Sequence, residues 1–506
     1  MVRVELSLIS HTNVGKTTLA RTLLRRDIGE ISDRAHVTDV AESDVLIESP
    51  EGDTLVLWDT PGFGDSARLL RRLKRSGQPL GWFLTQVWDR LADRPFWCGQ
   101  QALRTVRDNS DVILYVVNAS EQPASAAYVG IEMEILGWLG KPVILLLNQL
   151  GPPGEPAAAR TEVSDWEIHA REYPCVRAVL PFDAFARCWV QEGTLFAQVQ
   201  AVLAGPMAEG FGRIRQEWTR RNLEVFEQSM RVLARQVAAC ARDVEPLATA
   251  SLQGKARSWI AAATSAVSGA VAAAPGGAAA SLPGGDAELA RAERALASRL
   301  DSAVRAATEE LVRLHGLTGT ATQEVLKRMG HEFLVQRPAD ADKASVLGGL
   351  VSGALGGLAA DLGAGGLTFG AGAVIGGVLG AVGARGLAKA YNLARGSDSG
   401  TVRWSPGFLS GRLVAALMRY LAVAHFGRGR GAFVSGVAPA RWLQEVTAAL
   451  ERRRDQLETL WAQSRSGGEP DATALALLPI AAAAAGEVLA QLYPDSASML
   501  GTQIGR

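Results

Sequence analysis

Cysteine is scarce in this chain, and neither sign of charge is in excess. The four cysteines among its 506 residues are Cys98, Cys175, Cys188 and Cys240, and no two of them form a Cys-x-x-Cys pair. This usage gives no sign of a disulfide framework or a paired-cysteine metal site, and it is typical of reduced thiols in the cytosol. The 52 basic residues match the 52 acidic ones, so the net charge indicates no attraction to nucleic acid.

A secretion signal is also missing from the start of the sequence, which goes directly into the apolar run Val4–Ile9. We therefore expect no cleavable leader and a cytoplasmic location. A chain of this length is too long for one hydrophobic core, so two or three domains are expected.

A phosphate-binding loop is predicted directly after that apolar run. Residues 10–18 read SHTNVGKTT, so that a strand leads into a Gly-Lys-Thr loop and then into a helix. Backbone N–H groups of such a loop hold a polyphosphate, Lys16 would neutralise its β- and γ-phosphates, and Thr17 would ligate Mg²⁺. The full pattern has Gly where this chain has Ser10. The predicted nucleotide-binding residues of the loop are Ser10, Asn13, Val14, Gly15, Lys16, Thr17 and Thr18.

A second motif, Asp-Thr-Pro-Gly at residues 59–62, ends another apolar run. Asp59 would reach Mg²⁺ through water, and the N–H of Gly62 would approach the γ-phosphate because no side chain blocks it. Between the two motifs, Thr38 would ligate Mg²⁺ when the γ-phosphate is present, which makes its loop a switch. The order and spacing predict that the chain binds a nucleoside triphosphate, with Lys16, Thr38 and Gly62 acting on the γ-phosphate.

The base-reading motif departs from the guanine-specific pattern. The apolar run 142–147 ends in Asn-Gln-Leu-Gly, where guanine-specific proteins have Asn-Lys-x-Asp. Asn148 and Gln149 are still predicted to contact the nucleotide, but Gly151 replaces the carboxylate that reads guanine, which leaves base selectivity open. Asp183, shortly after the next predicted strand, could supply that carboxylate from a neighbouring loop. The alternative is that Asp183 is a solvated turn residue.

With these motifs, the first 205 residues resemble the Era/TrmE-like bacterial GTPases. The residues that carry the resemblance are Asn13-Val14-Gly15-Lys16-Thr17, Thr38, Asp59-Thr60-Pro61-Gly62 and Asn148. The resemblance implies an α/β P-loop GTPase domain, with a mostly parallel sheet and helices on both faces, that uses Mg²⁺ to hydrolyse GTP to GDP. The whole chain looks most similar to a bacterial branch that joins such a domain to a C-terminal helical, Gly/Ala-rich domain of unknown function.

The resemblance also bears on the rate of hydrolysis. Phe63 follows the second motif at the position where other GTPases carry a water-orienting Gln, and it cannot hydrogen-bond a nucleophile. In the best-studied relatives an Asn at the position of Asn13 holds K⁺, which acts where an arginine finger otherwise would. A role of Asn13 in stabilising the loop is equally open. In either case, slow hydrolysis that is stimulated from outside is expected.

After Gly205 the alternation of strands and loops ceases, and a mainly α-helical domain is expected. Apolar residues recur at helical spacing over residues 208–245, 286–336 and 437–465. The expected parts of the chain are a GTPase domain at 1–205, a first helical part at 206–344, a Gly-rich hydrophobic hairpin at 345–390 and a second helical part at 391–506.

Residues 345–384 contain fourteen glycines and a single charge, Asp361. Glycines spaced by four, as at Gly349, Gly353 and Gly357, let helix backbones approach closely, so the stretch predicts a glycine-zipper helical hairpin. Two arrangements remain open. The hairpin inserts into or lies against a membrane, or it forms the dry centre of a soluble helical domain.

The sequence therefore predicts a GTP-binding and GTP-hydrolysing molecular switch in the cytoplasm, with peripheral or integral attachment to the inner membrane as an open question. One alternative is a nucleotide-sensing scaffold with little turnover that docks a membrane-protein partner through residues 345–384. Another is a ribosome- or RNA-associated assembly GTPase, although the neutral charge balance argues against a nucleic-acid partner. Relatives that dimerise across the nucleotide face add a homodimer to the expectations.

Overall fold

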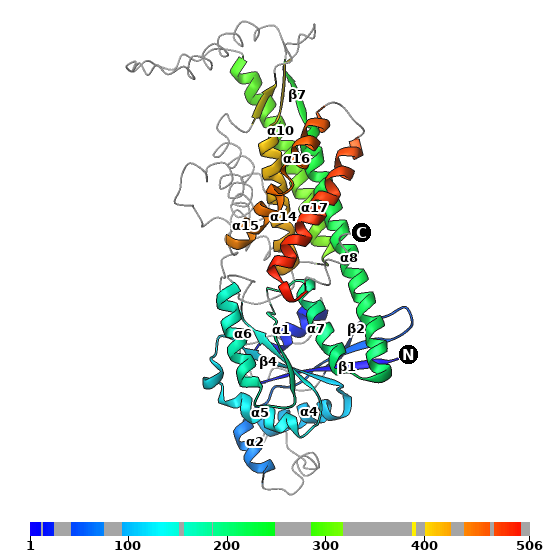
Figure 1. Ribbon diagram of the computed structural model, residues 1–506, viewed down its shortest axis with the longest axis vertical. Helices are drawn as coiled ribbons and strands as arrows, with labels where there is room; N and C mark the ends of the chain where they lie inside the picture. Colours follow the sequence, from blue (N-terminus) through cyan, green and yellow to red (C-terminus); the bar gives the residue numbers. More distant parts are fainter. Residues whose placement is uncertain are drawn as a thin grey trace, which may run out of the picture.

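The molecule is elongated, with a sheet domain at one end and a helical region at the other (Figure 1). The computed structural model describes residues 1–11, 14–24, 42–74, 94–150, 156–184, 186–247, 285–316, 387–390, 400–426, 440–465 and 470–496.

The sheet domain contains six strands in the order β2-β3-β1-β4-β5-β6. Their bounds are β1 (Arg3–Ser10), β2 (Glu42–Glu48), β3 (Thr54–Asp59), β4 (Val112–Asn118), β5 (Val143–Asn148) and β6 (Val176–Pro181). Every neighbouring pair is parallel except β2 and β3, which are antiparallel. Strands β4 and β5 are buried along almost their whole length, as expected for parallel strands covered on both faces.

Helices cover both faces of this sheet, because successive side chains of each strand point to opposite sides. Val112, Leu114 and Val116 of β4 join an apolar cluster with α1 (Lys16–Leu24) and α7 (Trp189–Val202). Ile113 and Tyr115 join a second cluster on the other face. The helices of that second face are α2 (Ser66–Leu73), α4 (Arg94–Asn109), α5 (Ala127–Gly137) and α6 (Pro156–Ala170), with the short turn η1 (Pro123–Ser125) before α5. The predicted α/β P-loop fold with helices on both faces is confirmed.

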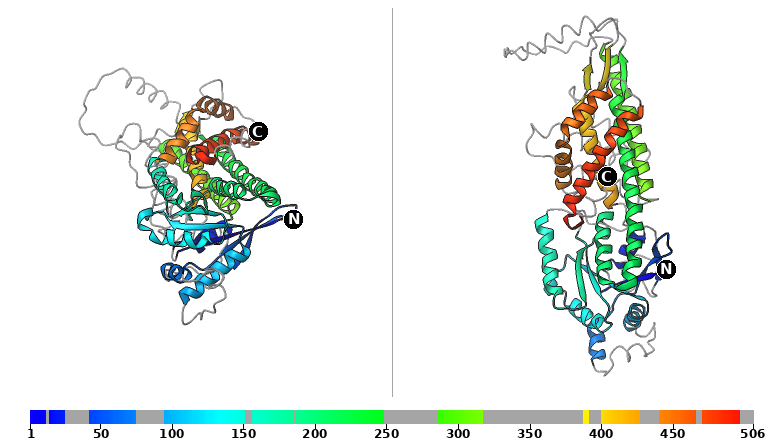
Figure 2. Two further views of the ribbon diagram at one scale, coloured as in Figure 1. Left: turned by 60° about the horizontal axis from the view of Figure 1, so that its bottom comes forward. Right: turned by 45° about the vertical axis from the view of Figure 1, so that its right-hand side comes forward.

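The remaining part of the chain is largely helical, as predicted. Its described helices are α8 (Gly205–Arg242), α10 (Gly285–Leu314), α14 (Pro406–Phe426), α15 (Ala440–Glu451), α16 (Arg454–Ser464) and α17 (Pro470–Leu492), followed by the turn η2 (Pro494–Ser496). The helix α8 runs from the side of the sheet to the far end of the molecule, which Figure 2 shows from a second direction.

A small antiparallel sheet in this region corrects the expectation that strands cease after Gly205. It has the order β7-β9-β8, with β7 (Val244–Leu247), β8 (Leu387–Ala390) and β9 (Gly400–Trp404). These strands are only four or five residues long, and β7 contains Pro246, so the sequence gives no clear strand signal for them. The pairing of β7 with β9 joins segments far apart in the chain, and composition carries no sign of it.

Two helices in the described ranges are long and apolar enough to cross a membrane, over residues 406–425 of α14 and 471–492 of α17. Such helices also occur in the interior of domains that never meet a bilayer, and 83% of the apolar window in α14 is buried inside the structure, against 44% in α17. The predicted hairpin at 345–384 lies outside the residues that the structure describes, so both of its proposed arrangements stay predictions.

The sheet domain and the helical region share one hydrophobic core. The cluster that begins with Val4 and Leu6 of β1 continues through Phe211 and Trp218 of α8 to Leu489 of α17. The first half of α8 packs beside β1, β2 and β3, and its second half packs against α10, α14 and α17. The helical region is therefore packed continuously with the face of the sheet that α1 covers.

Candidate P-loop nucleotide site

The loop between β1 and α1 has the backbone that a phosphate-binding loop requires. Gly15 lies at φ +88°, in the left-handed region that favours glycine, and its carbonyl accepts the N–H of Leu19 at 3.0 Å to start α1. A Cβ at Gly15 would stand 2.8 Å from Nδ2 of Asn148. Both the backbone angle and the space therefore demand glycine at this position.

Ser10 fits where the full pattern has glycine. It is buried at the end of β1, and its hydroxyl donates to the carbonyl of His11 at 2.6 Å. Within the described ranges, Gln149 is the one non-glycine residue with a positive φ, so Ser10 has an ordinary backbone that accepts a side chain. The departure from the pattern thus leaves the fold of the loop intact.

Lys16, Thr17 and Asp59 meet at the start of α1. The ammonium of Lys16 hydrogen-bonds to Oδ1 of Asp59, and the Thr17 hydroxyl donates to Oδ2 of the same carboxylate at 2.8 Å. Lys16 and Asp59 are 6% and 5% exposed, so each charge depends on the other in this buried setting. Two motifs separated by forty residues in sequence therefore form one polar cluster.

The second motif is fastened to the end of β1. The Thr60 hydroxyl donates to the carbonyl of Leu8 at 2.7 Å, and the N–H of Phe63 donates to the carbonyl of Ser10 at 2.9 Å. Gly62 between them is partly exposed, whereas Phe63 is fully buried in the apolar cluster of the second face. No hydrogen-bonding side chain stands at position 63.

Asn148 joins the phosphate loop to the loop after β6. Its Nδ2 donates to the carbonyl of Val14 and its Oδ1 accepts the N–H of Ala184, both at 2.8 Å. The side chain is fully buried, so it fixes these two loops relative to each other rather than facing solvent. Gln149, which follows it, is exposed and has φ +66°.

Asp183 is 3% exposed, so it is not a solvated turn residue. Its Oδ1 accepts the N–H of Ala186 at 2.9 Å, which stabilises the loop after β6. Its predicted role as a guanine-reading carboxylate stays a prediction. Asn13 and Thr38, with their predicted K⁺ and Mg²⁺ roles, lie outside the described residues.

Arg187 is a central residue of this loop that the sequence analysis missed. It is fully buried, and its guanidinium donates to Glu192 at 3.0 Å, to the Thr22 hydroxyl of α1 at 2.9 Å and to the carbonyl of Asp183 at 3.1 Å. Its N–H donates to the carbonyl of His425, at the end of α14, at 3.2 Å. The apolar residues around Arg187 in the sequence indicate that it is buried, but they do not indicate any of these hydrogen-bond partners.

His11 lies in a second network that the sequence analysis missed. Its Nδ1 is 2.7 Å from Oε1 of the fully buried Glu132 on α5, and the hydroxyl of Tyr115 donates to Oε2 at 2.6 Å. Burial lowers the pKa of His11, but the hydrogen bond and the charge of Glu132 outweigh it, so the pKa is raised overall. The ring also stacks on Tyr128 at 4.4 Å. The phosphate loop is thereby tied to α5.

The oxygen donors of the cluster suit Mg²⁺. A hydroxyl and a carboxylate that lie 2.8 Å apart, as in Thr17 and Asp59, are hard ligands of the type that Mg²⁺ takes beside substrate phosphates. Among the described residues, no group of three His, Cys, Asp or Glu side chains could hold a metal on protein ligands alone. The site therefore fits a cation that arrives with a nucleotide.

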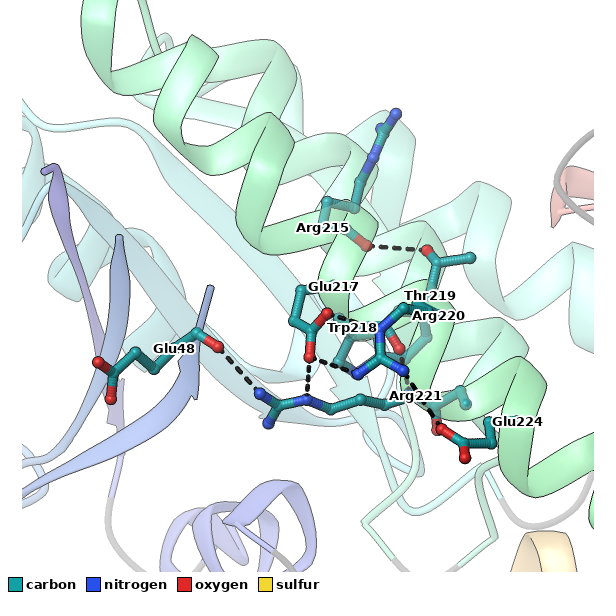
Figure 3. Close-up of polar contacts among 9 residues, drawn as sticks. Glu48, Arg215, Glu217, Trp218, Thr219, Arg220, Arg221 and Glu224 are labelled. Carbon is teal, nitrogen blue, oxygen red and sulfur yellow. Dashed lines mark hydrogen bonds and ion pairs between the residues drawn. The ribbon is translucent and has the colours of Figure 1, made fainter. Parts of the chain in front are cut away.

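A second junction links the β2–β3 hairpin to α8. Oδ2 of the buried Asp53 accepts from Nε of Arg213 at 2.6 Å, and Oδ1 accepts the N–H of Val2 at 2.7 Å. Eight residues further along α8, Arg221 donates to the carbonyl of Glu48 at 3.0 Å while Glu217 holds its guanidinium at 2.5 Å (Figure 3). The hairpin therefore contacts α8 at both ends of a two-turn stretch.

The sheet domain resembles known GTPases. Residues 5–149 match the family of 50S ribosome-binding GTPases. No curated protein matches the chain. Among solved structures, an Era variant from Aquifex aeolicus bound to GDP and AlF₄⁻ is 19% identical with a TM-score of 0.31, covering 40% of this chain and 58% of its own. Era in complex with MgGDPNP and a segment of 16S ribosomal RNA is 21% identical with a TM-score of 0.27, covering 36% of this chain and 52% of its own.

This chain thus spans little more than half the length of those two proteins. Residues 175–476 match a family described as a domain of unknown function, DUF3482, and this match begins at β6, inside the sheet. It covers more than half of the chain. The protein belongs to the DUF3482 family and carries a P-loop GTPase domain in front of its helical region.

Proposed function

We propose that this protein is a guanine-nucleotide switch that hydrolyses GTP slowly and is stimulated by a partner. The observation that carries the proposal is the buried cluster of Lys16, Thr17 and Asp59 at the phosphate loop. A GTPase domain supports GTP binding and hydrolysis in general. We propose in addition that hydrolysis of GTP is slow, that a partner stimulates it, and that the nucleotide state is coupled to the helical region.

The residues of the cluster would separate when a nucleotide binds. Lys16 would move its hydrogen bond from Asp59 to the β- and γ-phosphate oxygens, and the Gly62 N–H would contact the γ-phosphate. Thr17 and Thr38 would hold Mg²⁺ directly and Asp59 would hold it through water, and the ion would offset phosphate charge. Water would then attack the γ-phosphate in line, giving GDP and phosphate.

Two junctions support transmission of the nucleotide state to the helical region. The loop after β6, which Asn148 ties to the phosphate loop, contacts α14 through Arg187 and His425. The β2–β3 hairpin follows the segment that holds Thr38 and contacts α8 through Asp53. A change at either end of the nucleotide would therefore reach a different helix.

A rival function is a nucleotide-sensing scaffold with negligible turnover. Phe63 favours it, because this residue is fully buried and carries no group that could orient water. Binding without turnover would still use both junctions. The two functions differ only in whether phosphate is released over many cycles.

The deciding experiment measures GTP binding and multiple-turnover phosphate release on the full chain. We expect Lys16→Ala to weaken binding at least tenfold and turnover at least a hundredfold, because the γ-phosphate loses its main cation. Lys74→Ala is the matched control, since this lysine is 55% exposed and pairs with Glu134 on the surface. Turnover that is the same in Lys16→Ala and wild type would exclude the enzyme and leave the scaffold.

Two further arms of that experiment address the base and the monovalent cation. Tight GTP binding with little ATP binding would support guanine selectivity despite Gly151, and Asp183→Asn would then test the buried carboxylate. Faster release in KCl than in NaCl would support a K⁺ role for Asn13. Equal rates would support its alternative role in the loop.

Partners and location remain proposals. We propose that residues 345–384 dock on a membrane or a membrane protein, and that two chains form a homodimer across the nucleotide face. Both proposals can be tested on the purified chain. The description of the family that matches residues 5–149 makes a ribosomal partner the competing proposal. Co-purification of ribosomal RNA with the wild-type protein would favour the ribosome, and flotation with vesicles would favour the membrane.

A further inference from the structure

Two arginines lie buried on one side of α14, away from the nucleotide site. Arg412 is 3% exposed and Arg419 is 2% exposed, and they are seven residues apart, which is about two turns on the same side of a helix. Nε and Nη2 of Arg412 and Nη1 of Arg419 are buried and have no hydrogen-bond partner in the structure. Neither guanidinium has a carboxylate within salt-bridge distance among the described residues.

Another buried arginine in the part of the chain that the structure describes, Arg187, has a partner of opposite charge. Arg187 has Glu192 as its counter-charge and donates to a hydroxyl and a carbonyl as well. Removing a guanidinium from water is unfavourable unless a partner of opposite charge compensates it. Within the described ranges, neither Arg412 nor Arg419 has such a partner, and the two charges also repel each other. A negatively charged group between the two guanidiniums would therefore stabilise this part of the interior.

Loss of the proton does not resolve this arrangement. Burial, and then the nearby charge of Arg412, lower the pKa of Arg419 to about 9. Burial also lowers the pKa of Arg412. A pKa of about 9 leaves Arg419 charged at neutral pH, so a compensating anion is still needed.

The neighbouring helix adds a neutral polar group. Gln236 of α8 is 5% exposed, and both atoms of its amide are buried without a partner. One turn later on the same side of α8, Cys240 lies close enough to Arg412 for the two groups to influence each other electrostatically. Since α8 and α14 pack together, Gln236 lies one helical turn from the point where Cys240 of α8 approaches Arg412.

We propose that Arg412, Arg419 and Gln236 form an anion site inside the helical region that takes a phosphate group. A phosphate matches the two guanidiniums in charge, and a planar guanidinium can donate two parallel hydrogen bonds to a pair of phosphate oxygens. One carboxylate would leave a positive charge uncompensated. The phosphate belongs to a phospholipid headgroup or to a free phosphate compound. The site does not rest on GTP hydrolysis and lies in the DUF3482 part of the chain.

The first test measures thermal unfolding of the full chain with inorganic phosphate, against chloride at equal ionic strength. We expect phosphate to raise the unfolding temperature by about 2 °C or more, because a ligand that binds only the folded chain stabilises it. The double variant Arg412→Met with Arg419→Met should lose this shift. Arg235→Met, an exposed arginine on α8, is the control and should keep it.

The second test identifies the source of the phosphate by lipid extraction and mass spectrometry of purified protein. About one phospholipid per wild-type chain, reduced at least tenfold in the double variant, assigns a headgroup. A phosphate-dependent shift without lipid assigns a free phosphate compound.

Wild-type protein that shows neither the phosphate shift nor a bound phospholipid overturns the proposal, even if the variants fail to fold. A double methionine variant that keeps the full phosphate shift of wild type overturns it too, since the two arginines then do not bind the anion. Arg419→Lys, which keeps the charge, should retain part of the shift.

Discussion

Phe63 follows Gly62, the residue that we propose contacts the γ-phosphate, yet the ring of Phe63 belongs to the apolar cluster that also holds Leu69 and Phe96. A polar side chain here would lose that packing before it could reach a water molecule. We expect Phe63→Gln to lower the free energy of unfolding by about 2–4 kcal/mol and to leave turnover within threefold of wild type. Denaturant unfolding and phosphate release check both parts. A tenfold faster variant of unchanged stability would show that the ring is not required in the core.

Gly15 carries the geometry of the phosphate loop. A methyl group there meets both a positive φ and the amide of Asn148 at 2.8 Å. We expect Gly15→Ala to weaken GTP binding at least tenfold, measured by titration with a fluorescent nucleotide. Gly140→Ala is the matched control, because Gly140 also has a positive φ (+66°) but nothing within 4 Å of its added Cβ. That control should lose about 1 kcal/mol of stability and no affinity. Equal binding by both variants would contradict the proposed crowding.

At this scale, sequence reasoning succeeded where a motif has a fixed local form. The meeting of Lys16, Thr17 and Asp59 follows from the order of two motifs on neighbouring parallel strands. The partners of Arg187 could not be inferred, because Thr22 and His425 come from distant parts of the chain. The roles of Asn13, Thr38 and Asp183 toward ligands stay predictions.

Among the elements, the hairpin of β2 and β3 depends on α8 through one carboxylate. The hydrogen bond from Arg213 holds the pKa of Asp53 below its usual value of 3.8, against the opposing effect of burial. A lowered folded-state pKa means that this group adds stability above about pH 3.8, and that the added stability is lost as the pH falls through the folded pKa. We therefore expect Asp53→Asn to be less stable than wild type at pH 7.

The difference between Asp53→Asn and wild type should shrink below about pH 3.8, where the wild-type carboxylate also takes up its proton. Urea unfolding at pH 7 and near pH 3 measures it. Glu51→Gln, exposed in the same turn, is the control and should show no such pH dependence. A constant difference between Asp53→Asn and wild type at both pH values would mean that the ion pair with Arg213 does not set this stability.

Helices and strands could be predicted from the sequence where their apolar residues follow a clear spacing. Apolar runs predicted four of the parallel-sheet strands, β1, β3, β5 and β6, and helical spacing predicted α8 and α10. The antiparallel strand β2 was not foreseen, since its polar and apolar residues alternate weakly although it pairs locally with β3. The sheet of β7, β8 and β9 was not foreseen either, since its strands are short and β7 pairs with the distant β9. Local propensity carries no information on such partners.

For the molecule as a whole, the shared core predicts one cooperative unfolding transition. Trp189 and Phe196 of α7 pack against Trp218 of α8, so the GTPase fold is not closed at residue 205. We expect the fragment 1–205 to aggregate or unfold below the temperature at which the full chain melts, whereas GTP should shift the full-chain transition as a single peak in calorimetry. Two separate peaks, only one of them shifted by GTP, would contradict a common core.

The length of α8 has a mechanical consequence. Its 38 residues make a straight rod of about 57 Å, held at its base by the hairpin turn and joined at its far end to β7. A tilt of about 5° at the base would carry the far tip through about 5 Å, given that length. The rod is thus a lever arm with its fulcrum at the start of β1 and β3, at the opposite end of these strands from the phosphate loop. If nucleotide binding tilts the base through the β2–β3 hairpin, reciprocity requires that a load on the tip change the affinity for nucleotide.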